Sequence, residues 1–219
     1  MFAFRNKIYQ HIEWDWGLMM KRLFDIITGL CLLCLFSPIM LGVAIVVRAK
    51  LGSPILFKQK RVGHHEQIFT LFKFRTMTNE KDEAGNDLPD SIRLTKIGLM
   101  IRRLSLDELP QLLNVVKGDM SLVGPRPLLV RYLPYYTIEE RKRHSVRPGI
   151  TGYAQVEGRN QLDWNSRLRL DVKYVENRSF RLDMRIIFKT ISKVLKRDGI
   201  ANVPDQQMLD FDVERRMKA

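Results

Sequence analysis

One apolar stretch near the N-terminus dominates the hydrophobic pattern of the chain. Residues 26–47 include no charged side chain, and at about 1.5 Å of rise per helical residue they are long enough to span a bilayer. A cleavable signal peptide fits less well, because the stretch is long, starts late and lacks a small-residue cleavage site. The pattern therefore predicts a membrane helix.

Two features bear on whether this helix crosses the membrane. Ser37-Pro38 lies near its middle, where a proline removes a backbone hydrogen bond and favours a kink. Basic residues flank both ends, and the positive-inside tendency would hold both flanks in the cytoplasm. These flanking residues are Lys21, Arg22, Arg48, Lys50, Lys58, Lys60 and Arg61. A single span and a re-entrant helix broken at Ser37-Pro38 are both compatible with the pattern.

Asp25 is the acidic residue closest to the apolar stretch. It lies four residues after Lys21, so the two side chains share one helical face and we expect them to form an ion pair. At the membrane edge such a pair would offset the cost of an otherwise isolated carboxylate.

The remaining pattern predicts shorter elements. Residues 1–20 mix aromatic and charged positions, which is typical of an interfacial lead-in. Residues 55–57 and 68–72 predict two short strands around Gly63, and residues 81–90 predict a polar surface loop. The tail from residue 198 onward is polar, and we expect it to be loosely ordered.

Helical spacing returns in two basic, amphipathic stretches. Their apolar positions are Leu94, Ile97, Ile101 and Leu104 in the first, and Met184, Ile187, Phe188, Ile191 and Leu195 in the second. Helices of this kind either lie in the membrane interface or cover a soluble core with a solvated basic face. The sequence leaves both interpretations open.

Composition narrows the classes of partner. The 219 residues include 37 Lys and Arg against 24 Asp and Glu, giving a net charge of +13. This surplus indicates polyanionic partners: nucleic acid, anionic lipid head groups or phosphorylated small molecules. The two cysteines, Cys31 and Cys34, lie inside the apolar stretch. A zinc site would need about four ligands, so we expect both to be reduced, small apolar residues.

Residues 102–110 carry the strongest candidate chemistry. Ser105 and Glu108 have the spacing of a helix-capping box, a purely structural interpretation. The functional alternative rests on the same helix N-terminus, which can bind phosphate oxygens. Nearby arginines would keep Asp107 ionised, as a carboxylate nucleophile requires, and the adjacent carboxylates of Asp107 and Glu108 could hold a divalent ion.

Two arginines lie in proline-containing turns downstream. Arg126 stands between Pro125 and Pro127, and Arg147 precedes Pro148. A guanidinium on a stiff turn suits bidentate phosphate contact. The four histidines have no Ser or Cys partner in evidence and are interpreted as surface residues.

Taken together, these motifs resemble those of the monotopic phosphoglycosyl transferases, the bacterial sugar transferase family. The resemblance runs from about residue 20 to 199, and it is strongest to small members such as diacetylbacillosamine 1-phosphate transferases. It covers KRLFDIITGLCLLCLFSPI, KFRTM, RRLSLDELPQLLNVVKGDMSLVGPRP and HSVRPGITGYAQVEGRN. Several long, ordered matches make this a specific signal.

The resemblance implies a mechanism and roles for particular residues. Asp107 would be the nucleophile that takes a phosphosugar from a UDP-sugar, releasing UMP, and passes it to undecaprenyl phosphate by a ping-pong mechanism. Glu108 would be the second member of the catalytic pair, with Mg²⁺ near the two. Lys73, Arg102, Arg126 and Arg147 match basic positions that hold phosphate or nucleotide. Lys21, Asp25, Ser37 and Pro38 match the membrane-anchoring positions.

The resulting expectation is an α+β, mainly helical protein. It comprises a lead-in (1–20), a re-entrant membrane helix broken at Ser37-Pro38 (21–50), a small cytoplasmic catalytic domain with interfacial amphipathic helices (51–200) and a polar tail (201–219). We expect it at the cytoplasmic face of a bacterial inner membrane, in contact with anionic lipids and without nucleic acid. The sugar, the glycan pathway and the oligomeric state, a dimer included, stay open.

Two other functions compete with this one. A membrane-tethered binding module for anionic lipid or nucleic acid would explain the charge, but it would give Asp107 and Glu108 only a capping role and would favour aromatic–basic platforms. A nucleotide-sugar hydrolase would use water in place of the lipid, and a membrane anchor would then be unnecessary for the reaction.

Overall fold

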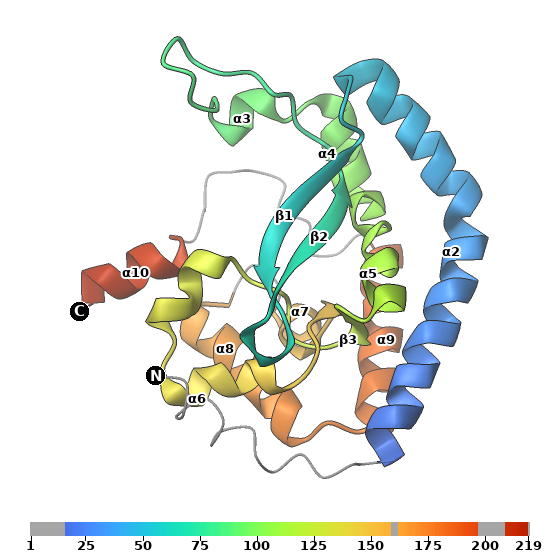
Figure 1. Cartoon of the computed structure of the whole chain (residues 1–219), viewed down its shortest axis with the longest axis vertical. Helices are drawn as coiled ribbons and strands as arrows, with labels where there is room; N and C mark the ends of the chain where they lie inside the picture. The colour runs from blue at the N-terminus through green and yellow to red at the C-terminus, as the bar shows by residue number, and fades with distance from the viewer. Residues whose placement is uncertain (1–15, 159–161, 197–208, 219) are drawn as a thin grey trace.

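The computed structural model describes residues 16–158, 162–196 and 209–218. Within these ranges the protein is α+β and mainly helical, as predicted (Figure 1). The α-helices are α2 (Trp16–Leu51), α3 (Asp90–Arg93), α4 (Lys96–Arg103), α5 (Gln111–Lys117), α6 (Ile138–Arg141), α7 (Tyr153–Glu157), α8 (Trp164–Glu176), α9 (Phe180–Leu195) and α10 (Phe211–Lys218). Short 3₁₀ helices are η1 (His64–Glu66), η2 (Leu106–Glu108), η3 (Val130–Tyr135) and η4 (Lys142–Ser145).

Helix α2 contains the predicted apolar stretch and runs for 36 residues without interruption. It is long and apolar enough to cross a membrane, over Met19–Leu51. The predicted break at Ser37-Pro38 is wrong. Pro38 cannot donate to the carbonyl of Cys34, but the Ser37 hydroxyl donates to that carbonyl at 2.8 Å instead. The helix therefore continues through the proline, and Figure 1 shows it curving around one side of the molecule.

Both ends of α2 contact the same globular body. Near the N-terminal end, Asp25 is 2% exposed and accepts a hydrogen bond from the backbone N–H of Leu122 at 3.1 Å. Near the C-terminal end, Val47 is fully buried in a cluster with Phe74 and Ile101. The helix is therefore attached to the body near both of its ends, instead of projecting from it at one end.

The outer face of α2 is apolar and exposed. Its exposed apolar residues include Met19, Met20, Leu23, Ile27, Leu30, Leu35, Ile39, Leu41, Ile45 and Val46. Soluble monomers seldom expose a continuous apolar surface of this extent, so it indicates contact with a membrane or a partner. Cys31 and Cys34 are free and exposed on the same helix, as predicted.

The predicted strands form a hairpin. Strands β1 (Leu56–Val62) and β2 (Ile68–Phe74) pair antiparallel, from Leu56 opposite Phe74 to Val62 opposite Ile68. A second small sheet pairs β3 (Ser121–Val123) with β4 (Gly149–Thr151) in parallel. This parallel pair brings two proline-containing turns, distant in sequence, next to each other.

The predicted amphipathic helices are α4 and α9. Helix α9 buries Ile186 in the main core and leaves Phe188 and Ile191 exposed. It lies beside α2, since Phe24 and Phe180 pack edge to face with ring centroids 5.4 Å apart. Apolar side chains of α9 therefore extend the exposed apolar face of α2.

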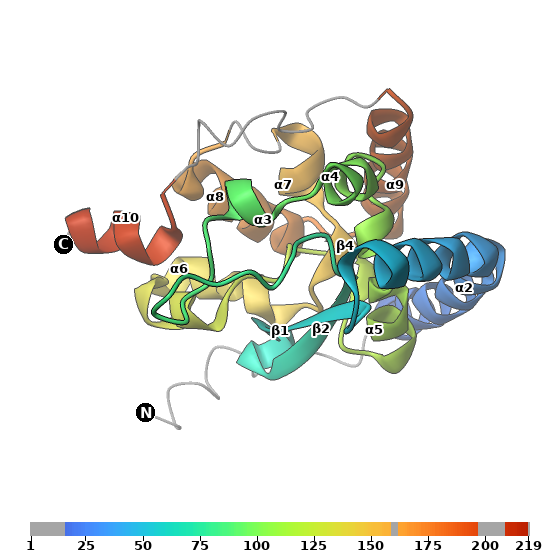
Figure 2. The same cartoon turned by 90° about the horizontal axis from the view of Figure 1, so that it is seen from above.

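Part of the predicted loosely ordered tail is a docked helix. Phe211 at the start of α10 is fully buried against Tyr132, Tyr136 and Trp164. Figures 1 and 2 show α10 and α2 on opposite sides of the body. Tail residues 197–208 and 219 and lead-in residues 1–15 lie outside the described ranges, whereas 16–20 form the first turns of α2.

Candidate active site

A cavity of about 1590 Å³ lies between α2, the β1–β2 hairpin, η2 and α9. One part of its wall is polar and includes Lys73, Arg102, Asp107, Glu108 and Arg126. Another part is apolar and includes Leu32, Phe36, Ile187, Ile191 and Val194. Ligand sites commonly combine apolar walls with a few placed polar groups. This cavity can accommodate a ligand that has both charged and apolar parts.

The candidate carboxylates lie on η2, directly after a residue in an unusual backbone conformation. Ser105 has φ 55° and ψ 20°, in the left-handed backbone region that residues other than glycine rarely adopt. Its side chain makes no capping hydrogen bond, so the predicted capping box is wrong. Residues held in such conformations are concentrated at functional sites.

Glu108 is held between two cations. Lys73 Nζ lies 2.6 Å from Glu108 Oε1, and Arg126 Nη2 lies 2.9 Å from the same oxygen. Burial raises the pKa of Glu108, but the charges and hydrogen bonds of Arg126 and Lys73 outweigh burial and lower it to about 2. Glu108 is therefore ionised at neutral pH, and its negative charge holds the side chains of Lys73 and Arg126 in place.

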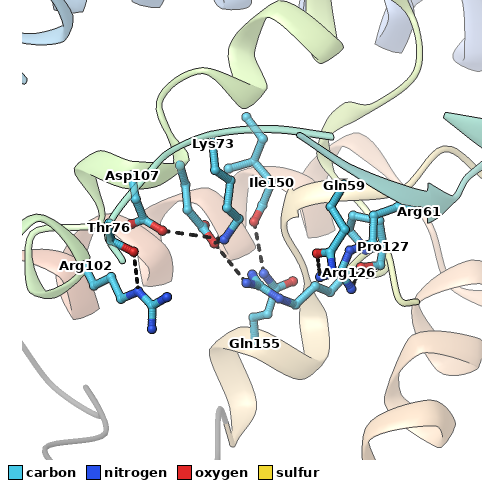
Figure 3. Close-up of polar contacts among 11 residues, drawn as sticks. Gln59, Arg61, Lys73, Thr76, Arg102, Asp107, Arg126, Pro127, Ile150 and Gln155 are labelled. Carbon is cyan, nitrogen blue, oxygen red and sulfur yellow. Dashed lines mark hydrogen bonds and ion pairs between the residues drawn. The ribbon is translucent and has the colours of Figure 1, made fainter. Parts of the chain in front are cut away.

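The carboxylate of Asp107, in contrast to that of Glu108, is only weakly engaged by cations. Its nearest cation is Lys73, with Nζ 3.6 Å from Oδ2, and its carboxylate accepts no hydrogen bond from any described residue. Burial, and to a lesser extent the charge of Glu108, raise the pKa of Asp107 above its ordinary value, against the opposing charge of Lys73. The sequence predicted that nearby basic groups would keep this carboxylate ionised, and burial works against that effect. Figure 3 shows Asp107 close to Lys73.

Arg102 lies on the other side of Asp107 (Figure 3). Its Nε donates to the hydroxyl of Thr76 at 2.9 Å. Its terminal nitrogens make no further hydrogen bond or ion pair with the described residues. Arg102 can therefore offer two N–H groups to an anion bound beside Asp107.

Arg147 is not part of this site, and its predicted place beside the carboxylates is wrong. Its Nε donates to the carbonyl of Gly118 at 3.0 Å, directly after α5. Arg22 donates to the carbonyls of Val115 and Val116 at 2.7 and 2.9 Å. Both arginines therefore satisfy carbonyl groups at the C-terminal end of α5, a favourable place for positive charge.

The two arginine–proline turns are nevertheless neighbours. Gly149 N donates to Pro125 O at 3.0 Å, and a Cβ atom on Gly149 would lie only 2.1 Å from Gly124 N. The sequence correctly indicated that both turns belong to one region. The two guanidinium groups point to different partners, which only side-chain placement decides.

The expected ion pair between Lys21 and Asp25 is also wrong. Lys21 Nζ instead lies 2.5 Å from Asp183 Oδ2 on α9, and Asp25 binds the Leu122 amide. The two residues still attach α2 to the body, through separate partners. Two residues one helical turn apart can each find a better partner in another element, which spacing alone does not reveal.

Several residues of the cavity were not singled out from the sequence as site residues. Arg143 and Asp171 form a buried ion pair at 2.8 Å, and Arg143 Nη2 also donates to the carbonyl of Arg126 at 2.7 Å. Gln59 and Arg61 on β1 line the same cavity. Arg61 appeared in the sequence only as one of several basic residues that follow the apolar stretch. Residues this far apart in sequence offered no local pattern that would have grouped them.

The residues present can fit the predicted Mg²⁺ in a limited way. Among the described residues, no group of three or more His, Cys, Asp or Glu side chains could hold a metal ion. Magnesium, however, often uses one or two carboxylates together with substrate phosphates and water. Asp107 offers oxygens that accept no hydrogen bond from the described residues, whereas Glu108 already binds two cations.

Comparisons with known proteins match nearly the whole described chain. A family model for bacterial sugar transferases matches residues 16–197. EpsL, a sugar transferase of Bacillus subtilis, is 58% identical over 84% of this chain and 91% of its own length. The undecaprenyl-phosphate galactose phosphotransferase of Salmonella typhimurium is 40% identical over 82% of this chain and 41% of its own length.

A third relative carries a different sugar in its name. The UDP-N-acetylgalactosamine-undecaprenyl-phosphate N-acetylgalactosaminephosphotransferase of Aeromonas hydrophila is 39% identical over 82% of this chain and 44% of its own length. The chain therefore spans less than half the length of the Salmonella and Aeromonas relatives, and nearly all of EpsL.

Proposed function

Because the chain belongs to the bacterial sugar transferase family, we propose that it transfers a sugar 1-phosphate from a UDP-sugar to undecaprenyl phosphate and releases UMP. The Salmonella and Aeromonas relatives are named for transfer to undecaprenyl phosphate, which supports this acceptor. The reaction would be the first membrane step in assembling a glycoconjugate.

The contrast between Asp107 and Glu108 carries the proposal. A carboxylate nucleophile needs an oxygen lone pair that is not engaged by a strong donor. Glu108 Oε1 is engaged by two cations at 2.6 and 2.9 Å, whereas the closest cation to Asp107 is 3.6 Å away. Asp107 is therefore the nucleophile in this proposal, and Glu108 positions the cations that receive the phosphates.

The first half of the reaction forms a covalent intermediate. An oxygen of Asp107 attacks the β-phosphorus of the UDP-sugar, and the bond from that phosphorus to the bridging oxygen breaks. UMP leaves with the bonding electron pair, and the phosphosugar stays on Asp107. Lys73, Arg102 and Arg126 are placed to neutralise the phosphate oxygens, which is the main requirement of phosphoryl transfer.

The second half returns the enzyme to its starting state. An oxygen of undecaprenyl phosphate attacks the same phosphorus, and the Asp107 carboxylate leaves with the electron pair. The apolar wall formed by Leu32, Phe36 and Ile191 supports a lipid acceptor, because a polyprenyl chain reaching the carboxylates would need such a surface. A hydrolase would have no use for this wall.

We further propose that the protein is monotopic, at the cytoplasmic face of the inner membrane. A helix that crossed the bilayer would place its ends on opposite sides, whereas Asp25 and Val47 contact one body. The exposed apolar residues of α2 and α9 would then lie in the lipid, and the basic residues would meet anionic head groups. This arrangement keeps Asp107 beside the acceptor.

Magnesium is proposed as the cofactor, held by Asp107, with a lesser part for Glu108, and by the diphosphate of the donor. The ion would neutralise charge on the diphosphate. Chelation with EDTA should therefore abolish UMP release, and added Mg²⁺ should restore it. Full activity in EDTA would contradict a metal requirement.

The central experiment separates covalent transfer from the alternatives. The full chain in detergent or nanodiscs would be incubated with a panel of UDP-sugars that includes UDP-galactose and UDP-N-acetylgalactosamine, without acceptor. We expect a burst of UMP no larger than the amount of enzyme, and a phosphosugar adduct by intact mass spectrometry. Undecaprenyl phosphate should convert this burst into continuous turnover.

Asp107→Asn is the matched control for this experiment, because it preserves shape and removes the nucleophile. It should give neither adduct nor UMP. Continuous UMP release without lipid would instead identify a hydrolase. Absence of UMP with every sugar nucleotide, with or without lipid, would favour the binding module.

A further inference from the structure

Arg61 is a partly buried cation in the cavity that forms no ion pair with a carboxylate of the described residues. Its Nη2 donates to Gln59 Oε1 at 2.5 Å, and its Nη1 donates to the carbonyl of Pro127 at 3.3 Å. The Nε is buried and makes no hydrogen bond within the described ranges. Both oxygens bound by this guanidinium are neutral, so nothing among the described residues that it contacts balances its charge.

The arginines around Arg61 differ from it in this respect. Arg126 pairs with Glu108, and Arg143 pairs with Asp171. Arg131 pairs with Asp210 and Asp212, next to and within α10. Burial, together with the positive charges of Arg126 and Arg131, lowers the pKa of Arg61 to about 10, against a smaller opposing effect of Glu108. A buried charge without a counter-charge is costly, and an anionic ligand would remove that cost.

The position of Arg61 relative to the carboxylates suggests which anion it meets. Figure 3 shows Arg126 between Asp107 and Arg61. A donor with its β-phosphorus at Asp107 can therefore extend past Arg126 toward Arg61. Arg61 lies on a strand paired with β2, and it forms a backbone bridge with Leu129, so its backbone is held in place at the cavity wall.

We propose that Arg61, oriented by Gln59, binds the nucleotide end of the donor, namely the phosphate that leaves as part of UMP. This inference rests on the function proposed above and assigns one end of its donor site. It implies that Arg61 contributes to the first half of the reaction and not to the second. In a ping-pong mechanism the two halves have separate kcat/KM values, which makes the division measurable.

The test compares Arg61→Met, which keeps the apolar stem and removes the charge, with the unmodified full chain in nanodiscs. We expect kcat/KM for the UDP-sugar to fall by about 10- to 100-fold, the range for a lost hydrogen bond between charged groups. The kcat/KM for undecaprenyl phosphate should stay within about twofold. Binding of UMP, measured by calorimetry, should weaken in parallel with the donor value.

Lys60→Met is the matched control. Lys60 lies between Gln59 and Arg61 on β1, so its side chain points to the opposite face of the strand. Its ammonium group donates a hydrogen bond to the hydroxyl of Thr70. The same loss of one positive charge should leave both kcat/KM values unchanged. Arg61→Lys keeps the positive charge but loses the planar guanidinium group, so we expect an intermediate loss of UMP affinity. This variant replaces Arg61→Met in the test if Arg61→Met does not fold.

The outcomes distinguish this inference from the function on which it depends. An unmodified enzyme that releases no UMP from any UDP-sugar would defeat the proposed function. An active enzyme whose Arg61 variants bind UMP normally, or lose acceptor kcat/KM instead, would overturn only the role of Arg61. Equal losses of donor kcat/KM in Arg61→Met and Lys60→Met would mean that the loss follows from the lower net charge alone. That result would also overturn the proposed role of Arg61.

Discussion

The two ends of helix α5 use the same kind of side chain for different purposes. Just before its N-terminal end, Arg126 and Lys73 bind the carboxylate of Glu108 at the wall of the cavity. At its C-terminal end, Arg22 and Arg147 bind backbone carbonyls of Val115, Val116 and Gly118. The first group of cations is organised for a ligand, and the second completes a helix end.

The difference lies in what each guanidinium donates to. Arg22 and Arg147 donate to the carbonyl groups that end α5, where the helix itself supplies no donor, so these two arginines stabilise the fold. An arginine bound to a carboxylate beside a second, barely engaged carboxylate keeps N–H groups and charge that a phosphate can use. Substitutions at the cavity end should therefore affect catalysis first, and those at the other end should affect stability first.

Among the substitutions that test this comparison of the two ends, the largest effect is expected for Glu108→Gln. This change removes the charge that holds Lys73 and Arg126, so the cations lose their positions and the phosphates lose their receptor. We expect kcat/KM for the donor to fall by about 100- to 1000-fold, comparable to loss of one preorganised electrostatic contact. Steady-state UMP release measures it. Activity within threefold of the unmodified enzyme would contradict the positioning role of Glu108.

A paired substitution, Arg126→Lys and Arg147→Lys, compares the two ends directly. Arg126→Lys should lower donor kcat/KM by about tenfold or more, because lysine cannot form the same fork. Arg147→Lys should leave it nearly unchanged and lower the melting temperature by a few degrees, since about 1 kcal/mol corresponds to about 2–4 °C for a chain of this size. The reverse pattern would refute the division between the ends.

The pH dependence should report Asp107. Its pKa is raised, and the nucleophile must be ionised, so activity should fall as the pH drops through a value above the ordinary pKa of about 4. Glu108, with a pKa of about 2, stays ionised over that range. Arg102→Gln removes a charge that lowers the pKa of Asp107 and should move the acid limb to higher pH. An unmoved limb would assign it to another group.

The smallest effect is a gain in stability from Asp107→Asn. Because the pKa of Asp107 is raised in the folded protein, its contribution favours folding at low pH and is lost as the pH rises through that pKa. The ionised carboxylate therefore destabilises the fold at neutral pH. We expect the inactive variant to melt at an equal or slightly higher temperature at pH 7, measured by thermal unfolding. A clear decrease would show that Asp107 is structural.

Helix α2 shows what a local sequence pattern can and cannot predict. The uncharged run of residues 26–47 determined a long apolar helix, because a charge-free stretch of that length has few other stable environments. Its proline also predicted a break, which did not occur. The hydroxyl of Ser37 replaces the hydrogen bond that Pro38 cannot make, and a geometric substitution of that kind cannot be read from propensity.

In the C-terminal region, the sequence pattern failed to predict an ordered helix. A mostly polar tail predicted little order, yet Phe211 is fully buried. The aromatic cluster that receives it comprises Tyr132, Tyr136 and Trp164, from segments far away in the chain. Scattered apolar residues in a polar segment give no clear periodic signal, and the burial of Phe211 depends on a pocket assembled by other elements.

The sequence by itself determined the apolar helix, the two strands around Gly63 and the Asp107-Glu108 pair with Arg102 close by, because these depend on residues close together in the chain. Composition alone determined the basic surplus. Only the tertiary structure decided which carboxylate is engaged, that Arg126 faces the cavity while Arg147 completes α5, and that Arg61 joins the site. Those outcomes depend on distances between side chains from different elements. A charged group takes the partner that packing brings within reach, and spacing along the chain does not specify that partner.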